Sequence, residues 1–238
     1  MSRGRVYQVT TAADGDFVSR MYSYWSNVFI QDGYAFVFAG HADGWPRFFQ
    51  VDLASGAVTS LGSLVNYAGT TEGWYWNADG AVSIPDLGPR LRRVDPFTGA
   101  EDVALDIRWT HPGCRLWQAH SSDDGRIHSA TVERPVEHGP YERVGTVVQA
   151  PSGQRFFGAN QDLDESQVSR DGRYLLIKEG AGPDNRVIDL ETGAERIITD
   201  AEGALGHSDC GDGFAVGEND RIGACVYLDL ETLEQRQL

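Results

Sequence analysis

Two histidines stand at equivalent positions of the sequence and offer metal-binding or acid–base chemistry. His120 precedes the pair Asp124-Gly125 by four residues, and His207 precedes Asp212-Gly213 by five. A neutral imidazole binds metals and exchanges protons near neutral pH. Gln118 lies two residues before His120, so in a regular strand both side chains face one side. Two interpretations are open: a reactive site, or hydrogen-bonded residues between neighbouring structural units.

Aromatic side chains occur in the same stretches of sequence. Flat rings with a polar edge suit the faces of sugars and the surfaces of protein partners alike. The alternative is that alternate rings, such as Trp74 and Trp76, pack in the core. For ligand contact we predict the tryptophans Trp25, Trp45, Trp76 and Trp117.

The net charge and the apolar content of the chain limit the classes of partner that we expect. With 35 acidic and 20 basic residues, the 238-residue chain has a formal net charge of −15. Such a surface repels a phosphate polyanion, so we expect no nucleic-acid partner; a solvated acidic face with one local basic spot is the alternative. No stretch approaches the ~20 apolar residues of a membrane span, and the first ten residues contain no apolar run. We therefore expect no membrane partner and a cytoplasmic location, with a place in a viral particle as the alternative.

An internal repeat organises the elements that must position these residues. Asp-Gly pairs recur at intervals of 41 to 47 residues, beginning at Asp32, Asp79, Asp124, Asp171 and Asp212. Each pair precedes a short β-rich run, which is typical of a hairpin. A second motif, VDLASG at 51–56, returns as VDPFTG at 94–99 and IDLETG at 188–193, and without its glycine as LDLET at 228–232.

Two turns per unit predict four strands in about 40–47 residues, the signature of a propeller blade. The sequence therefore predicts an all-β, five-bladed β-propeller with four-stranded antiparallel blades in a single domain. The expected blades are 23–62, 73–107, 115–160, 165–200 and 205–238. The segment 5–10 is expected to pair with the last blade and close the ring. A two-sheet sandwich, the alternative, does not explain the two turn motifs.

Several stretches resemble the oligogalacturonate lyase family. They are GRVYQVT at 4–10, YSYWSNVFIQDG at 22–33, FFQVDLASGAVTSL at 48–61 and LGHSD at 205–209. The repeats of TolB-like propellers match the two turn motifs almost as well. The similarity is specific in the first blade and covers the rest of the chain as a blade pattern. Oligogalacturonate lyases have seven blades, and this chain is long enough for five.

The resemblance implies a manganese ion on the propeller axis, held by histidines and a glutamine. On this sequence the implied ligands are His120, His207, Gln118, Gln167 and Asp209. Asp209 stands where the family has the second histidine of a close pair, and a carboxylate suits manganese.

The implied reaction is β-elimination on a uronate. His120 or His207 takes the proton, and Arg115 and Arg20 neutralise the substrate carboxylate. The alternative for both arginines is pairing with acidic side chains in solvent.

Three functions follow from these observations. The chain is a carbohydrate-directed propeller acting as a lyase on uronate oligosaccharides, or a glycan-binding relative of such a lyase. Alternatively, it is a non-catalytic binding or structural propeller, such as an adhesin or viral-particle subunit. In each case the oligosaccharide or protein ligand is expected on the loop face, which carries the loops leading into each blade and those joining its second and third strands. The fold does not choose among them.

Overall fold

The computed structural model describes residues 30–31, 34–39, 47–62, 74–137, 139–160, 163–179, 185–199, 205–219 and 221–238, with side chains from residue 49 onward. These residues form five antiparallel sheets of four strands each. The first sheet contains β1 (Ile30–Gln31), β2 (Tyr34–Ala39), β3 (Arg47–Asp52) and β4 (Val58–Ser60). The second contains β5 (Tyr75–Trp76), β6 (Val82–Pro85), β7 (Arg90–Val94) and β8 (Glu101–Asp106).

The other three sheets repeat this plan in chain order. The third contains β9 (Arg115–Ser121), β10 (His128–Arg134), β11 (Glu142–Ala150) and β12 (Gly153–Gly158). The fourth contains β13 (Leu163–Val168), β14 (Tyr174–Glu179), β15 (Asn185–Asp189) and β16 (Glu195–Ile198). The fifth contains β17 (Ser208–Cys210), β18 (Phe214–Asn219), β19 (Ala224–Asp229) and β20 (Gln235–Gln237).

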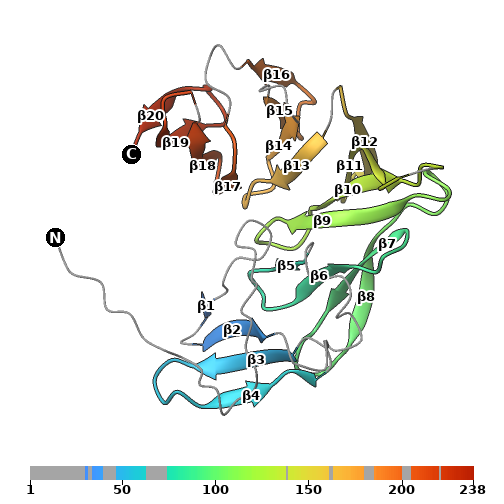
Figure 1. Cartoon of the computed structure of the whole chain (residues 1–238), viewed down its shortest axis with the longest axis vertical. Helices are drawn as coiled ribbons and strands as arrows, with labels where there is room; N and C mark the ends of the chain where they lie inside the picture. The colour runs from blue at the N-terminus through green and yellow to red at the C-terminus, as the bar shows by residue number, and fades with distance from the viewer. Residues whose placement is uncertain are drawn as a thin grey trace.

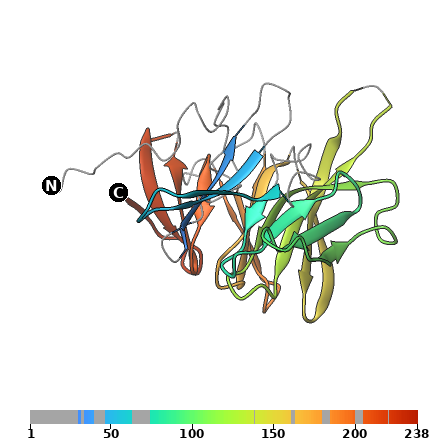
Figure 2. The same ribbon diagram turned by 90° about the horizontal axis from the view of Figure 1, so that it is seen from below.

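The sheets are arranged as blades around a common centre. The first strand of each sheet lies nearest the centre and the fourth lies at the periphery (Figure 1). From the side, the sheets form one layer (Figure 2). This arrangement confirms the predicted five-bladed propeller of four-stranded antiparallel blades. Among the described residues, no helix is long and apolar enough to cross a membrane.

Both repeated motifs form the turns for which their residue types are suited. In the four Asp-Gly pairs that the structure describes, the glycine has positive φ between the first and second strands, as at Gly80 (86°) and Gly172 (76°). In the second motif, the Asp52 carboxylate accepts hydrogen bonds from the backbone N–H groups of residues 54 and 55 at 2.8 and 3.0 Å. These bonds hold the pKa of Asp52 below its usual value. The last copy has no glycine, and Leu233 adopts the positive φ of 64° instead.

Gly56→Ala should lower the free energy of unfolding by about 1–2 kcal/mol, since Gly56 has a φ of 73° and an alanine there is strained. Nothing lies within 4 Å of the Cβ that would be added, so steric overlap makes no contribution. Gly62→Ala is the matched control, because Gly62 is equally open and its φ lies outside the left-handed region. Urea unfolding measures the change in the free energy of unfolding for both variants. Equal effects of the two substitutions would contradict the turn assignment.

Apolar contacts between successive blades form the core. Several inner strands of the described part of the chain are buried on both faces, as in β6 and β14, where every residue is buried. One cluster joins the second and third blades and includes Leu91, Leu116 and Val147. Another joins the third and fourth and includes Val148 and Ile177. Each blade therefore depends on its neighbours to cover its apolar faces.

The predicted closing strand, 5–10, lies outside the described residues, so its pairing stays a prediction. The last blade already has four strands within 208–237. Any pairing of 5–10 with this blade would therefore add a fifth strand.

Candidate functional site

A bulge in the innermost strand of the third blade determines which side chains lie together. Ala119 is opposite Ala130 and Trp117 is opposite Thr131, so Gln118 has no partner across the β9–β10 pair. Gln118 has a φ of 46°, in the left-handed region, which is costly for a residue with a side chain. Its amide oxygen accepts a hydrogen bond from the Thr131 hydroxyl at 3.0 Å. Regular alternation therefore no longer relates Gln118 to His120.

The bulge places three of the predicted site residues on one face of the third blade. Arg115, Trp117 and His120 lie opposite alternate residues of β10, from Glu133 to Ser129. Alternate residues of a strand share a face. This face is turned toward the fourth blade, since β13 contacts β9, β10 and β11. The sequence order alone would have assigned Trp117 and His120 to opposite faces.

At the end of this face where β9 begins, Arg115, Trp117, Glu133 and Tyr141 form what we term the arginine–aromatic cluster. The Arg115 guanidinium carbon lies 3.6 Å from the centroid of the Tyr141 ring and 5.6 Å from that of Trp117. Arg115 Nε donates to Glu133 Oε2 at 2.7 Å. The Nη groups of Arg115 have no hydrogen-bond partner within the described part of the chain. Since Tyr141 is 42% exposed, the cluster reaches solvent.

Arg143 connects the cluster to the fourth blade. Its Nε lies 3.6 Å from Glu133 Oε1. Its Nη1 donates to the backbone carbonyls of Leu163, at 3.3 Å, and Asp164. Glu133 is therefore held by two arginines, and one of them also holds the start of β13.

A buried ion pair occupies the interior between the fourth and fifth blades. Lys178 and Glu165 are in contact, with side chains 4% and 2% exposed. Lys178 Nζ also donates to the Gly206 carbonyl at 2.9 Å. Burial lowers the pKa of Lys178 to about 8. Gln167, a predicted metal ligand, donates from Nε2 to the Ser208 carbonyl at 2.7 Å, so its amide group joins the two blades.

His120, on the face of the third blade that is turned toward the fourth, is 3% exposed. Its ring centroid is 5.1 Å from that of Tyr75, in the second blade. Burial lowers the pKa of His120 to about 3, and the nearby charge of Lys178 adds to the effect. The imidazole is therefore neutral throughout the physiological pH range.

His207 and Asp209 lie in the fifth blade and have different partners. His207 Nδ1 is 3.7 Å from Glu218 Oε2, in the next strand of the same blade. The Asp209 carboxylate is 55% exposed and lies 3.7 Å from Arg170 Nη2. His207 and Asp209 therefore lie beside different partners, Glu218 and Arg170.

Three of the five predicted manganese ligands have other partners in the structure. Gln167 is engaged with Ser208, Asp209 with Arg170 and His207 with Glu218. Within the ranges described, no group of three or more His, Cys, Asp or Glu side chains is placed to hold a metal ion. These contacts do not fit a shared metal centre, and manganese binding stays a prediction from the resemblance.

The predicted ligand-contacting residues fall into three groups. Trp117 and Arg115 lie in the arginine–aromatic cluster. Trp76 is 5% exposed and packs with Leu61 and Trp74, which agrees with the alternative of a core ring. The remaining three lie outside the described residues: Arg20, Trp25 and Trp45.

The buried ion pair was not anticipated from the sequence, although a signal was present. Lys178 is the single lysine of the chain, beside 19 arginines. It follows the apolar run 174–177, where a charged residue implies a buried partner. Tyr141 and Glu133 gave no comparable signal, because their contact with Arg115 depends on the pairing of three strands.

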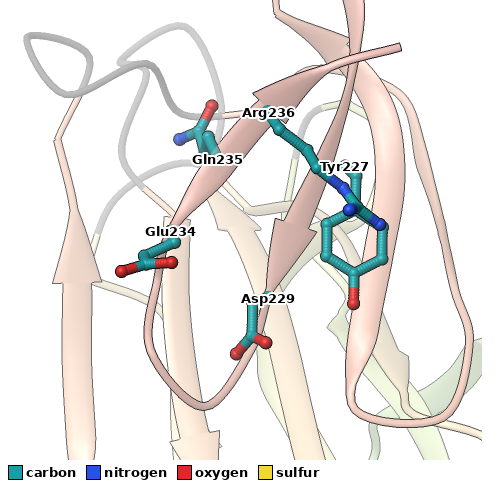
Figure 3. A pocket seen from close by; sticks show the side chains of 5 residues that line it. All are labelled: Tyr227, Asp229, Glu234, Gln235 and Arg236. Atoms are coloured by element: carbon teal, nitrogen blue, oxygen red, sulfur yellow. The ribbon is translucent and has the colours of Figure 1, made fainter.

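A shallow hollow lies at the outer side of the last blade. It encloses about 230 Å³ and is lined by Tyr227, Asp229, Glu234, Gln235 and Arg236. Arg236 lies over the Tyr227 ring, 4.3 Å from its centroid (Figure 3). None of these residues belongs to an innermost strand, so the hollow is separate from the predicted site.

Comparisons with known proteins show the fold alone. No protein-family model and no curated protein matches the sequence. Among solved structures, TolB from Acinetobacter baumannii superposes with a TM-score of 0.52 and 11% identity, over 85% of this chain and 50% of that one. Apo AztD from Citrobacter koseri gives 0.51 and 12%, over 87% and 57%. The calcium-binding protein regucalcin from Agrobacterium tumefaciens gives 0.50 and 17%, over 87% and 70%.

These neighbours include TolB, whose repeats resemble the two turn motifs, and they support the propeller architecture. The chain spans half the length of the TolB structure and 57% of AztD. At such identities no residue role is transferred from them.

Proposed function

We propose that this protein is a non-catalytic β-propeller that binds acidic oligosaccharides, such as uronates, on the loop face of its third blade. The arginine–aromatic cluster carries the proposal. Glu133 and the Tyr141 ring hold the Arg115 guanidinium in place, while its Nη groups remain available to a ligand.

The chemistry of the cluster matches that of a uronate. The fork of a guanidinium recognises a carboxylate through two parallel hydrogen bonds. The rings of Trp117 and Tyr141 supply flat apolar surface with polar edges, which suits the face of a sugar. In a chain with a net charge of −15, an anionic ligand needs a local cation of this kind.

Binding without elimination is favoured by the surroundings of His120. A general base must reach the proton it removes. His120 is buried against Tyr75, whereas Arg115 reaches solvent at the opposite end of β9. Lyase activity remains the second outcome of the test, and a protein ligand on the same cluster the third.

Arg115→Ala is expected to weaken binding of trigalacturonate by about 10–100-fold, the worth of charge-assisted hydrogen bonds to a carboxylate. Arg115→Lys should recover only part of the loss, since a lysine keeps the charge but not the fork. Isothermal titration calorimetry measures the affinity for trigalacturonate of the wild type and of both variants.

The matched control is Arg126→Ala. Arg126 is an exposed arginine that pairs with Asp124 in its own turn. This variant should bind as tightly as wild type. Arg115→Ala should remain folded, because Glu133 keeps Arg143 as a partner. Circular dichroism checks this. Equal binding by wild type and Arg115→Ala would refute the proposed site.

A further inference from the structure

Five buried polar atoms at the interface of the third and fourth blades have no hydrogen-bond partner within the described ranges. All belong to side chains with no more than 3% exposure. They are Gln118 Nε2, His120 Nε2, Ser129 Oγ, Thr146 Oγ1 and Ser166 Oγ. We call this set the polar seam. Buried polar atoms are almost always hydrogen-bonded, because an unpaired one costs about 1–3 kcal/mol.

Strand register places His120, Ser129 and Thr146 on one face of the third blade. Ser129 is opposite His120 on β9 and opposite Val148 on β11. Thr146 precedes Val148 by two residues in the same strand, so the two share a face. Val148 belongs to the apolar cluster between the third and fourth blades, so this face is turned toward the fourth blade.

Ser166 completes the seam from the fourth blade. It precedes Val168 by two residues in β13, and Val168 belongs to the same apolar cluster as Val148. Ile177, opposite Ser166 on β14, is a further member. Since β13 contacts β9, β10 and β11, the Ser166 hydroxyl faces the strands that carry the other four atoms.

The strained residue of the bulge also contributes to the seam. Thr131 satisfies the amide oxygen of Gln118, which leaves the amide nitrogen as a donor. A left-handed glutamine inside a strand persists only when its surroundings favour it. A partner for this nitrogen would offset part of the strain.

The donor set identifies the class of ligand. It contains three hydroxyls, one amide N–H₂ and one imidazole nitrogen, and none of these groups carries a charge at neutral pH. An ion would lack a counter-charge in the seam, because the nearby Lys178 is already paired with Glu165. Water both donates and accepts, and a buried water typically makes about three hydrogen bonds.

From this arrangement we infer that the polar seam is a binding site for ordered water, which joins the third and fourth blades as an integral part of the fold. The bound water bridges hydroxyls of β10 and β11 to Ser166 of β13 and accepts from the Gln118 amide.

Thr146→Val removes one water contact at nearly constant volume and is expected to lower Tm by about 2–4 °C, the shift that a lost hydrogen bond causes in a domain of this size. Thr59→Val, on the exposed face of β4, is the matched control and should change Tm little. A high-resolution crystal structure of the wild type should show water within hydrogen-bonding distance of at least two seam atoms.

The inference is overturned by a dry seam in that crystal structure, together with an unchanged or raised Tm for Thr146→Val. Removing a hydroxyl that has no partner is neutral or stabilising, whereas removing one that binds water is not. Ser166→Ala gives a second reading from the opposite blade and carries little risk of misfolding, because it removes a single atom.

Discussion

Replacing Lys178 with Met should lower the free energy of unfolding by about 3–5 kcal/mol, because the Glu165 carboxylate would remain buried without its cation. Both side chains are almost completely inaccessible, so solvent cannot compensate for the loss. The effect should appear in urea unfolding followed by tryptophan fluorescence. It is the largest change expected from a substitution outside the apolar core.

The double variant Glu165→Leu with Lys178→Met is the informative companion. Replacing both charges by apolar side chains removes the desolvation penalty together with the pair, which is often neutral or stabilising. The double variant should therefore be more stable than Lys178→Met alone. A single variant within 1 kcal/mol of wild type, with additive effects in the double variant, would show that the pair is solvated.

The free energy of unfolding should also decrease as the pH falls, because His120 is buried in its neutral form. Its pKa is lowered to about 3 in the folded protein, whereas an unfolded histidine titrates near 6.5. Between these values the unfolded state binds a proton that the folded state does not. The contribution of a neutral His120 is therefore complete above pH 6.5 and decreases as the pH falls toward 3.

The size of this effect can be isolated with His120→Gln, which does not titrate. From pH 7 to pH 4, the stability of wild type relative to His120→Gln should fall by about 3 kcal/mol. Urea unfolding at each pH measures the difference, and His207→Gln controls for loss of an imidazole outside the buried interface. A difference that is constant from pH 7 to pH 4 would mean that His120 is protonated, and hence hydrated, in the folded protein.

The turn motifs made the fold predictable. Each described Asp-Gly pair has a positive φ at its glycine, and the aspartate of each second motif accepts hydrogen bonds from backbone N–H groups of its own turn. These requirements are local, so they can be read from the sequence without knowledge of the neighbouring blades. Leu233 shows that one copy functions without the glycine, in agreement with the repeat continuing to the last blade.

The arrangement of the site depended on contacts that the sequence does not encode locally. The bulge at Gln118 changes the alternation of β9, and this change brings Arg115 and Trp117 to the face of His120. No residue type at positions 115–121 indicates a bulge. The contact of Arg115 with Tyr141 likewise depends on how β9, β10 and β11 are paired.

His120 and His207 do occupy similar positions in their repeats, before an Asp-Gly pair. This spacing did not predict which side chains they contact. Both residues lie near the start or end of an innermost strand. One is buried against Tyr75, and the other is half exposed beside Glu218. Equivalent positions in a repeat therefore led to different environments, since each blade has different neighbours.

Titration of the wild-type protein with trigalacturonate, in parallel with a neutral galactose trisaccharide, tests the central claim most directly. Calorimetry measures binding, and ultraviolet absorbance of the same mixture detects any new carbon–carbon double bond. The account predicts binding of the acidic sugar that weakens with added salt, little binding of the neutral sugar and no rise in absorbance. A rise in absorbance would contradict binding without catalysis, and equal binding of the two sugars would contradict a binding site built on Arg115.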